Sequence, residues 1–160
     1  MQQPPKPHHD LMVKQGERAN PMGTDGFEFV EFAAPDPTAL SQLFETMGFE
    51  AVAKHKSKKI TQYRQGDINF LLNAEPTGHA ADFAKKHGPC ACAMAFRVKD
   101  AMKAYDRAVS LGAVPFEGHT PKAGELHIPA IYGIGGSLLY FVDRYGDDNI
   151  YEMNFEPLPK

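Results

Sequence analysis

The sequence has only two cysteines, no run of basic residues and no long hydrophobic segment, and each of these absences excludes a class of protein. Cys90 and Cys92 lie two residues apart in a predicted strand and are too close in the chain to bridge easily, so we expect free thiols in a reducing cytosol. A formal net charge of −3 without a basic run gives no reason to expect nucleic-acid binding. No apolar stretch is long enough to cross a bilayer and the N-terminus lacks a signal-peptide core, so we expect a cytoplasmic protein with no membrane partner.

The chain contains two copies of one pattern, in which a strand is followed by a cap, a helix and a glycine stop. The copies read FVEFAAPDPTALSQLFETMG at 29–48 and AMAFRVKDAMKAYDRAVSLG at 93–112. In each copy the apolar residues alternate as in a strand, Asp36 or Asp100 suits the helix N-cap, and Gly48 or Gly112 ends the helix. The spacing of 64 residues holds without a gap, so the sequence predicts a duplicated supersecondary unit.

The chain length makes a single domain the default, with a core large enough to be stable. We expect a mobile extension at 1–25, one domain at 26–145 and a tail or linker at 146–160. The domain has two strand–helix–three-strand (βαβββ) modules, at 26–75 and 90–145, joined by 76–89. The last three strands of the second module are expected at 114–118, around 126–128 and at 138–143. The tail is rich in apolar residues, which suggests that it docks on a part of the protein outside this chain.

Two such modules side by side form an α+β fold, with a curled mixed sheet, helices on the convex face and an open concave face. Side chains alternate between the faces of a strand, so each face can be assigned from the sequence. The helix-covered face should carry Val30, Phe32, Met94, Phe96, Leu139 and Phe141. The concave face should carry Phe27, Phe29, Glu31, Ala93, Ala95, Arg97, Leu138, Tyr140 and Val142.

Paired modules with these signals resemble the vicinal-oxygen-chelate (glyoxalase/bleomycin-resistance) superfamily. Five segments together resemble more closely the N-terminal domains of the bacterial 4-hydroxyphenylpyruvate dioxygenase family. They are NPMGTDGFEFVEFAAP, YRQGDINFLLN, EP, HGPCACAMAFRVKDAMKAYDRAVSLGA and LHIPAIYGIGGSLLYFVDRYG. The segment AFRVKDAMKAY is typical of the whole superfamily, whereas YRQGDINFLLN and IPAIYGIGGSLLYFVDRYG are far more specific.

The resemblance implies an oxidoreductase of tyrosine catabolism, a non-haem iron enzyme that converts 4-hydroxyphenylpyruvate and O2 into homogentisate and CO2. In that family two histidines and one glutamate of a C-terminal domain hold Fe(II), leaving coordination positions open for substrate and oxygen. This chain would then be the metal-free N-terminal domain, inactive by itself. Its role would be structural, with the C-terminal catalytic domain as its partner, in the same chain or as a separate subunit, within a homo-oligomer.

The positions where such a module pair would hold a metal on its concave face are Phe29, Ala93 and Tyr140. Carbon side chains offer no lone pair, and a phenol with a pKa near 10 binds Fe(II) poorly at neutral pH. We therefore expect no catalytic or metal-binding residues in this chain and no cofactor of its own. Glu31 and Arg97 are predicted to lie near each other on this face, as a possible structural ion pair.

Two alternatives belong to other functional classes. The first is a stand-alone vicinal-oxygen-chelate protein that binds a small aromatic molecule in its concave face. The second is a small metalloenzyme using His119, Glu125 and His127, although these come from one continuous segment. A cluster of lysines at 54–59 is expected to be a solvated strand edge, with anion binding as the alternative.

Overall fold

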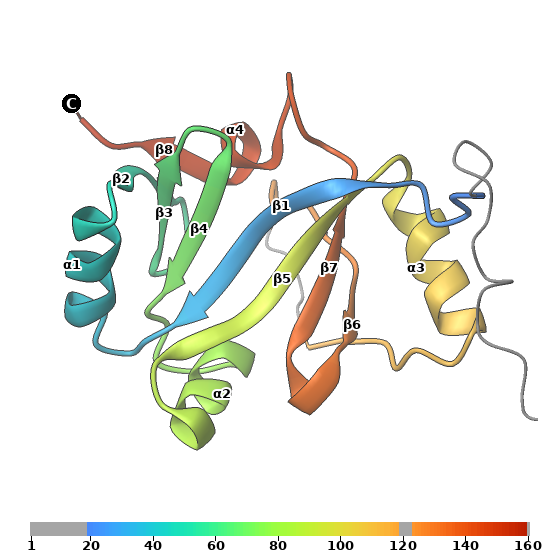
Figure 1. Ribbon diagram of the computed structural model, residues 1–160, viewed down its shortest axis with the longest axis horizontal. Helices are drawn as coiled ribbons and strands as arrows, with labels where there is room; N and C mark the ends of the chain where they lie inside the picture. Colours follow the sequence, from blue (N-terminus) through green and yellow to red (C-terminus); the bar gives the residue numbers. More distant parts are fainter. Residues whose placement is uncertain (1–18, 119–122, 160) are drawn as a thin grey trace, which may run out of the picture.

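The computed structural model describes residues 19–118 and 123–159, which form a curled sheet flanked by helices (Figure 1). The strands are β1 (Thr24–Ala33), β2 (Glu50–His55), β3 (Ile60–Gln65), β4 (Ile68–Asn73), β5 (Cys90–Val98), β6 (Ala130–Tyr132), β7 (Leu138–Val142) and β8 (Phe155–Pro157). The helices are α1 (Thr38–Thr46), α2 (His79–His87), α3 (Ala101–Ser110) and α4 (Ile150–Asn154), with a short 3₁₀ turn at Ile134–Gly136. Of the mobile extension expected at 1–25, residues 1–18 lie outside the described residues. Strand β1 begins within the remaining part, at Thr24.

The strand order places the two modules side by side. The order is β6-β7-β5-β1-β4-β3-β2-β8, with β1 parallel to β4, β5 parallel to β7, and β1 antiparallel to β5 at the centre. Each module therefore contributes one pair of parallel strands, β1 with β4 and β5 with β7. The two pairs run in opposite directions where β1 meets β5. The predicted α+β fold with paired βαβββ modules in a curled mixed sheet is confirmed.

The helices of the repeat, α1 and α3, pack on the face of the sheet that the sequence assigned to them. Phe44 of α1 packs against Phe32 of the sheet, and Ala104 of α3 packs in the cluster that contains Phe96. Asp100 caps α3 as predicted, because its carboxylate accepts the Lys103 amide hydrogen at 2.9 Å. In the first copy the prediction is off by one residue, because Pro37 is the N-cap of α1 and Asp36, just before it, accepts from the backbone amide of Thr38 at 3.1 Å.

A β-bulge in β1 changes which face two residues occupy. Phe29 pairs with Ala95 but Phe27 pairs with Phe96, so Glu28 is the extra residue. The bulge turns Phe27 away from the concave face, where we expected it, and toward Phe96, with the ring centroids 5.1 Å apart. Strict alternation of side chains fails at this point because one residue of β1 has no partner in β5.

The second module has fewer strand residues than expected. At 114–118 the only ladder contact among the described residues is an isolated bridge between Pro115 and Ile131. The strand expected around 126–128 lies instead at Ala130–Tyr132. A tight connection closes the β6–β7 hairpin, with the Gly133 amide donating to the Ser137 carbonyl at 2.8 Å, so the pairing strand must adjoin that turn.

The segment expected to be a tail at 146–160 is part of this domain. Its residues form α4 and β8, and β8 pairs antiparallel with β2 at the edge of the sheet. Ile150 and Phe155, 2% and 6% exposed, enter the core beneath the concave face rather than docking on another part of the protein. The domain thus extends beyond residue 145, because the apolar side chains of this segment cover apolar surface of the chain's own sheet.

Candidate functional site on the concave face

The three positions that could correspond to metal ligands lie on adjacent strands. Phe29 is on β1, Ala93 on β5 and Tyr140 on β7, and the rings of Phe29 and Tyr140 are 5.8 Å apart. Ala95, one row further along β5, is the cross-strand neighbour of both aromatic residues. These positions form an apolar and aromatic contact, and only the phenol oxygen offers a lone pair. That this chain has no catalytic residue and binds no metal stays a prediction.

The alternative ligand set is not assembled within the described residues. His119 lies outside them, and the carboxylate of Glu125 accepts a hydrogen bond from Ser57 and lies 3.7 Å from the Lys58 ammonium. Within residues 19–118 and 123–159, no group of three or more histidine, cysteine, aspartate or glutamate side chains has an arrangement that could hold a metal ion.

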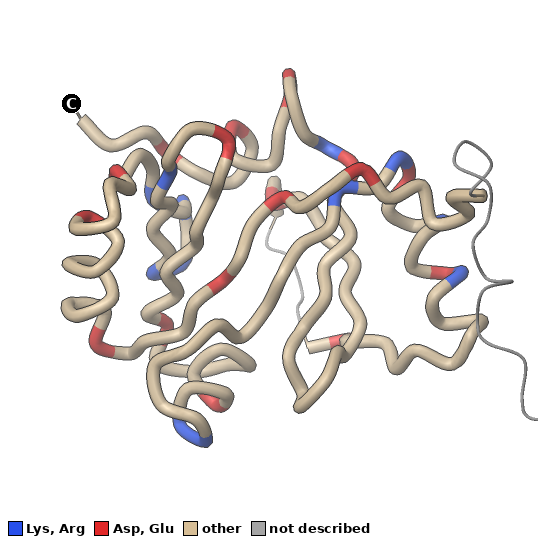
Figure 2. Tube along the Cα trace, in the orientation of Figure 1, with Lys and Arg blue, Asp and Glu red and all other residues tan. Residues whose placement is uncertain are grey.

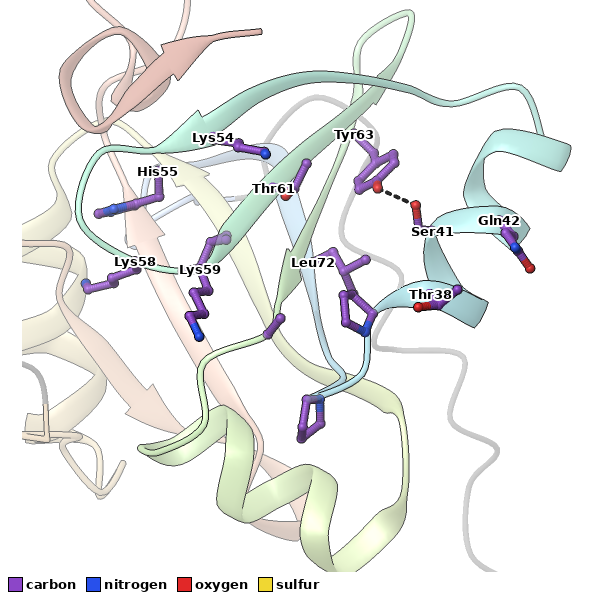
Figure 3. Close-up of a pocket in the computed structure, with 14 residues that line it drawn as sticks. Thr38, Ser41, Gln42, Lys54, His55, Lys58, Lys59, Thr61, Tyr63 and Leu72 are labelled. Carbon is purple, nitrogen blue, oxygen red and sulfur yellow. Dashed lines mark hydrogen bonds between the residues drawn. The ribbon is translucent and has the colours of Figure 1, made fainter.

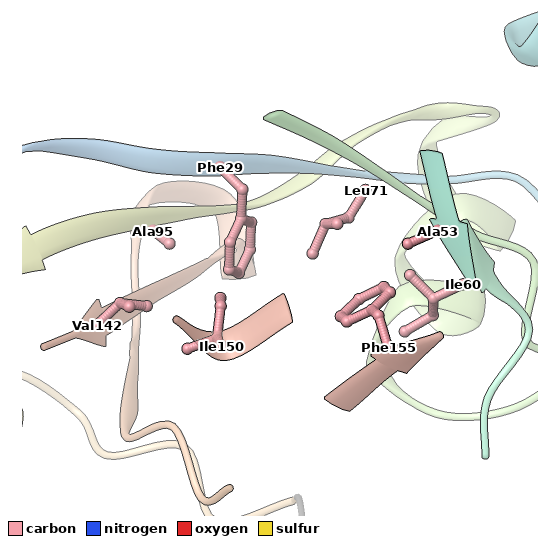
Figure 4. Close-up of a cluster of buried hydrophobic side chains, with 8 residues drawn as sticks. All are labelled: Phe29, Ala53, Ile60, Leu71, Ala95, Val142, Ile150 and Phe155. Atoms are coloured by element: carbon pink, nitrogen blue, oxygen red, sulfur yellow. The ribbon is translucent and has the colours of Figure 1, made fainter. Parts of the chain in front are cut away.

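An apolar cluster fills most of the concave face. Figure 4 shows side chains of the sheet converging on Ile150 of α4 and Phe155 of β8. The buried members are Phe29, Ala53, Ile60, Leu71, Ala95, Val142, Ile150 and Phe155. Leu126 and Ile128, from the loop expected to be a strand, pack against the same cluster. The concave face is therefore closed largely by the chain itself.

Two neighbouring cavities remain on this face, with volumes of about 90 and about 290 Å³. Their walls share Glu31, Lys58, Ile60 and Tyr140, and we call the pair the Glu31 cavity. The smaller part is lined mainly by the apolar cluster. The larger part is more polar and reaches the surface near Thr77, which is exposed.

Glu31 is the buried acid of this cavity, with 7% of its surface exposed. A second bulge, in β5, turns the Cys92 thiol toward it, so that Sγ donates to Oε2 at 3.3 Å. Burial raises the pKa of Glu31 above its ordinary value, against the opposing effect of hydrogen bonds from Cys92 and Asn73. Burial, followed by the nearby Glu31 charge, also raises the pKa values of Cys92 and Tyr140.

The raised pKa of Glu31 predicts that Glu31→Gln stabilises the fold increasingly as pH rises. Between the ordinary value of 4.5 and the higher pKa of the folded chain, the unfolded chain releases this proton while the folded chain retains it, so the cost of the carboxyl to stability grows with pH over that interval. We expect the variant to gain little over the wild type near about pH 4 and clearly more at about pH 7.5. Urea titrations at the two pH values measure this. A variant that is less stable than the wild type at the higher pH, but not at the lower pH, would contradict a raised pKa of Glu31.

The predicted ion pair between Glu31 and Arg97 is wrong, because Arg97 pairs with Glu28. Its Nε donates to Oε2 of Glu28 at 2.6 Å, and the Glu28 side chain is only 2% exposed. The bulge at Glu28 brings this carboxylate to the face of Arg97, which a strictly alternating strand does not allow. Gly26, with a φ of +94°, lies in a separate register shift of β1, between Thr24 and Phe27, and no glycine marks the bulge at Glu28 itself.

Arg97→Ala is expected to lower the free energy of unfolding by about 3 kcal/mol, because it leaves the buried Glu28 carboxylate without its cation. This is the low end of the range for buried pairs, since 30% of the Arg97 side chain is exposed. Arg64→Ala is the matched control. Arg64 lies 4.0 Å from Asp67 on the surface, and its loss should cost under about 1 kcal/mol. Equal losses in urea titrations of both variants would refute the structural role of the Glu28–Arg97 pair.

A separate groove of about 770 Å³ lies between α1 and the β2–β3 hairpin (Figure 3). The hydroxyls of Ser41 and Tyr63 are 2.7 Å apart across it, joining α1 to the sheet. Lys54 and Lys59 are exposed in its wall. The lysine cluster is not at a bare strand edge, since β8 pairs with β2 and the Lys56 ammonium donates to the Met153 carbonyl at 2.6 Å. Figure 2 shows lysine or arginine positions on the β2–β3 part of the chain beside aspartate or glutamate positions on and around α1.

Paired modules around a concave cavity define a domain of the vicinal-oxygen-chelate, or glyoxalase-like, class. The family described as hydroxyphenylpyruvate dioxygenase, HPPD, N-terminal, matches residues 18–156, and the chain belongs to this family.

Individual relatives give the same result. The chain is 58% identical over 147 residues to a 4-hydroxyphenylpyruvate dioxygenase of Pseudomonas aeruginosa, covering 90% of this chain and 41% of that protein. It is 56% identical over 139 residues to hemolysin VllY of Vibrio vulnificus, covering 85% and 39%. The solved structure of a xylose isomerase-like TIM barrel/4-hydroxyphenylpyruvate dioxygenase fusion protein superposes with a TM-score of 0.73 at 39% identity, covering 84% and 21%.

The chain spans about two fifths of the length of these two curated relatives. The match to one part of longer proteins does not favour the alternative of a stand-alone ligand-binding protein. Among the described residues, no helix has both the length and the apolar character needed to span a membrane.

Proposed function

We propose that this chain is the non-catalytic N-terminal domain of a 4-hydroxyphenylpyruvate dioxygenase acting in the cytoplasm. The complete enzyme would convert 4-hydroxyphenylpyruvate and O2 into homogentisate and CO2. Its Fe(II) would be held by two histidines and a glutamate of a C-terminal domain, in the same chain or in a separate subunit. The domain described here would support that catalytic part and contribute contacts within a homo-oligomer.

The observation that carries this proposal is the combination of a close family match with unsuitable side chains at the concave positions. The match to the P. aeruginosa dioxygenase extends over 90% of this chain, yet Phe29, Ala93 and Tyr140 bring hydrocarbon and a phenol to the strands where ligands would lie. Ile150 and Phe155 pack against Phe29 in the same apolar cluster, so the chain's own side chains occupy the space beside these positions.

A chimera tests the proposal most sharply. The matching N-terminal part of the P. aeruginosa relative is replaced by this chain, and the chimera and the isolated chain are each incubated with Fe(II), ascorbate and 4-hydroxyphenylpyruvate. We expect the chimera to consume O2 and form homogentisate and the isolated chain to form none.

Two results would contradict the proposal. Turnover by the isolated chain would show that it holds its own catalytic iron. A folded chimera without any activity, beside an active P. aeruginosa enzyme prepared in the same way, would show that this domain cannot support that catalytic part.

A further inference from the structure

The surface formed by α2 and the tip of the β6–β7 hairpin carries apolar side chains that the domain itself leaves uncovered. The two elements lie near each other at one end of the sheet (Figure 1) and border a groove of about 340 Å³. The groove is lined by the exposed Asp82 and Lys86 and the half-buried Phe83 of α2, and by Tyr132 of β6. We call this surface, together with the neighbouring Ile134 of the hairpin tip, the α2 face.

The hairpin tip presents an apolar side chain on a well-ordered backbone. Ile134 is the most exposed large apolar residue of the described chain, at 95%, and Tyr132, two residues earlier, is 41% exposed. Hydrogen bonds hold the tip in place, because His79 Nε2 donates to the Gly136 carbonyl at 2.7 Å and the Ser137 hydroxyl donates to the Ile134 carbonyl at 2.8 Å. A pre-organised element loses little conformational entropy when a partner covers it. Exposed apolar groups gathered beside a groove are typical of an interaction surface.

Two opposite charges flank the apolar part of the α2 face. Asp82 lies in the first turn of α2 and Lys86 in the last, four residues apart, and both line the groove, so they share one side of the helix. The ion pairs formed within residues 19–118 and 123–159 include neither of them. Phe83 lies between them in the sequence and lines the same groove. A partner with charge of a single sign would leave one of these two groups uncompensated.

A second copy of this chain compensates both charges. In a twofold contact each copy presents the same surface, and two α2 helices that face each other across an axis perpendicular to them run antiparallel. Asp82 of each copy then lies beside Lys86 of the other. The apolar side chains of the two α2 faces would be covered between the two ion pairs. An apolar centre with a charged rim is the usual anatomy of a protein–protein interface.

We propose that the α2 face forms a twofold contact between two copies of this chain. Asp82 of each copy pairs with Lys86 of the other, around an apolar centre made by Phe83, Tyr132 and Ile134. The contact gives a surface to the homo-oligomer of the proposed function and rests on that part of it alone. The face is small, so we expect a weak dimer with a dissociation constant in the micromolar range.

Charge reversal tests the contact, because a symmetric interface meets every substitution twice. The wild type, Asp82→Lys, Lys86→Asp and the double variant are compared by analytical ultracentrifugation at about 10 to about 500 µM. We expect the wild type to dimerise and each single reversal to weaken association by about tenfold or more, since it brings like charges together on both sides of the axis. The double reversal restores opposite charges and should associate within about threefold of the wild type.

Ile134→Lys tests the apolar centre and should abolish measurable dimerisation, because it places a charge where apolar groups meet. Two controls lie outside the α2 face. Lys85→Asp makes the same charge change at the residue next to Lys86, and Leu111→Lys places a lysine at another exposed apolar position, which is 71% exposed. Both controls should dimerise within about threefold of the wild type. All these positions are exposed, and circular dichroism verifies the fold of each variant.

The proposal is overturned if the folded wild-type chain stays monomeric at the highest concentration, or if Ile134→Lys dimerises as the wild type does. It is overturned equally if the double reversal associates no better than the single reversals, since Asp82 and Lys86 would then not face each other. Protection of the α2 amides from hydrogen exchange in the chimera, beside a monomeric isolated chain, would instead identify the catalytic part as the occupant. The chimera assay measures homogentisate, so failure of this contact and failure of the catalytic support are distinguishable.

Discussion

A chain that ends at Tyr145 is expected to be unfolded, or to lose about 5 kcal/mol or more of its free energy of unfolding. The deletion removes α4 and β8, and with them Ile150 and Phe155, which are 2% and 6% exposed. Each large apolar side chain removed from a core costs roughly 2 to 5 kcal/mol, and the two together approach the whole stability of a small domain. The loss also uncovers Phe29 and leaves β2 without its β8 partner.

Urea denaturation followed by circular dichroism measures this effect. A deletion of residues 159–160 alone is the control and should leave the transition almost unchanged, because β8 ends at Pro157. A cooperative transition at the wild-type urea concentration in the longer deletion would show that the C-terminal segment is dispensable. It would then support the earlier expectation of a tail that docks elsewhere.

The second large effect is expected from Phe44→Ala, which should cost about 3 to 5 kcal/mol. Phe44 is 2% exposed, and its ring lies within 5.0 to 6.3 Å, between centroids, of the rings of Phe32, Phe49, Tyr63 and Phe70. Its removal leaves a cavity beneath α1 that aromatic rings fill poorly by small shifts.

Leu43→Ala is the matched control for this prediction, because the adjacent side chain on the same helix is 48% exposed. Its replacement should cost under about 1 kcal/mol. Thermal and urea unfolding of the two variants provide the comparison. A loss for Phe44→Ala no greater than that for Leu43→Ala would show that the aromatic cluster under α1 does not stabilise the domain.

The paired modules could be predicted because each of them contains one copy of the sequence repeat. A strand, a capping aspartate, a helix and a glycine recur at a fixed spacing, and Asp100 caps α3 as the pattern requires. Apolar periodicity also assigned Phe32 and Phe96 to the helix-covered face. Local patterns of this kind depend on residues close in sequence, so they survive in the folded chain.

The departures from that prediction arise from tertiary effects that periodicity does not contain. The bulge at Glu28 reverses the face of Phe27 and gives Arg97 a partner that strict alternation excludes. The position of β6 depends on the turn that closes the hairpin, and the place of Ile150 in the core depends on apolar surface far away in sequence. Glu31 was expected on the concave face, but its contact with Cys92 depends on a second bulge.

The central claim is that the concave face of this domain has no iron site, and iron loading tests it directly. The purified chain is incubated anaerobically with excess Fe(II), desalted and examined for iron by elemental analysis, beside the P. aeruginosa dioxygenase treated in the same way. The account predicts iron at the level of the buffer for this chain and bound iron in the full-length enzyme. Equimolar iron retained by the chain, and lost on Glu31→Gln substitution, would contradict it.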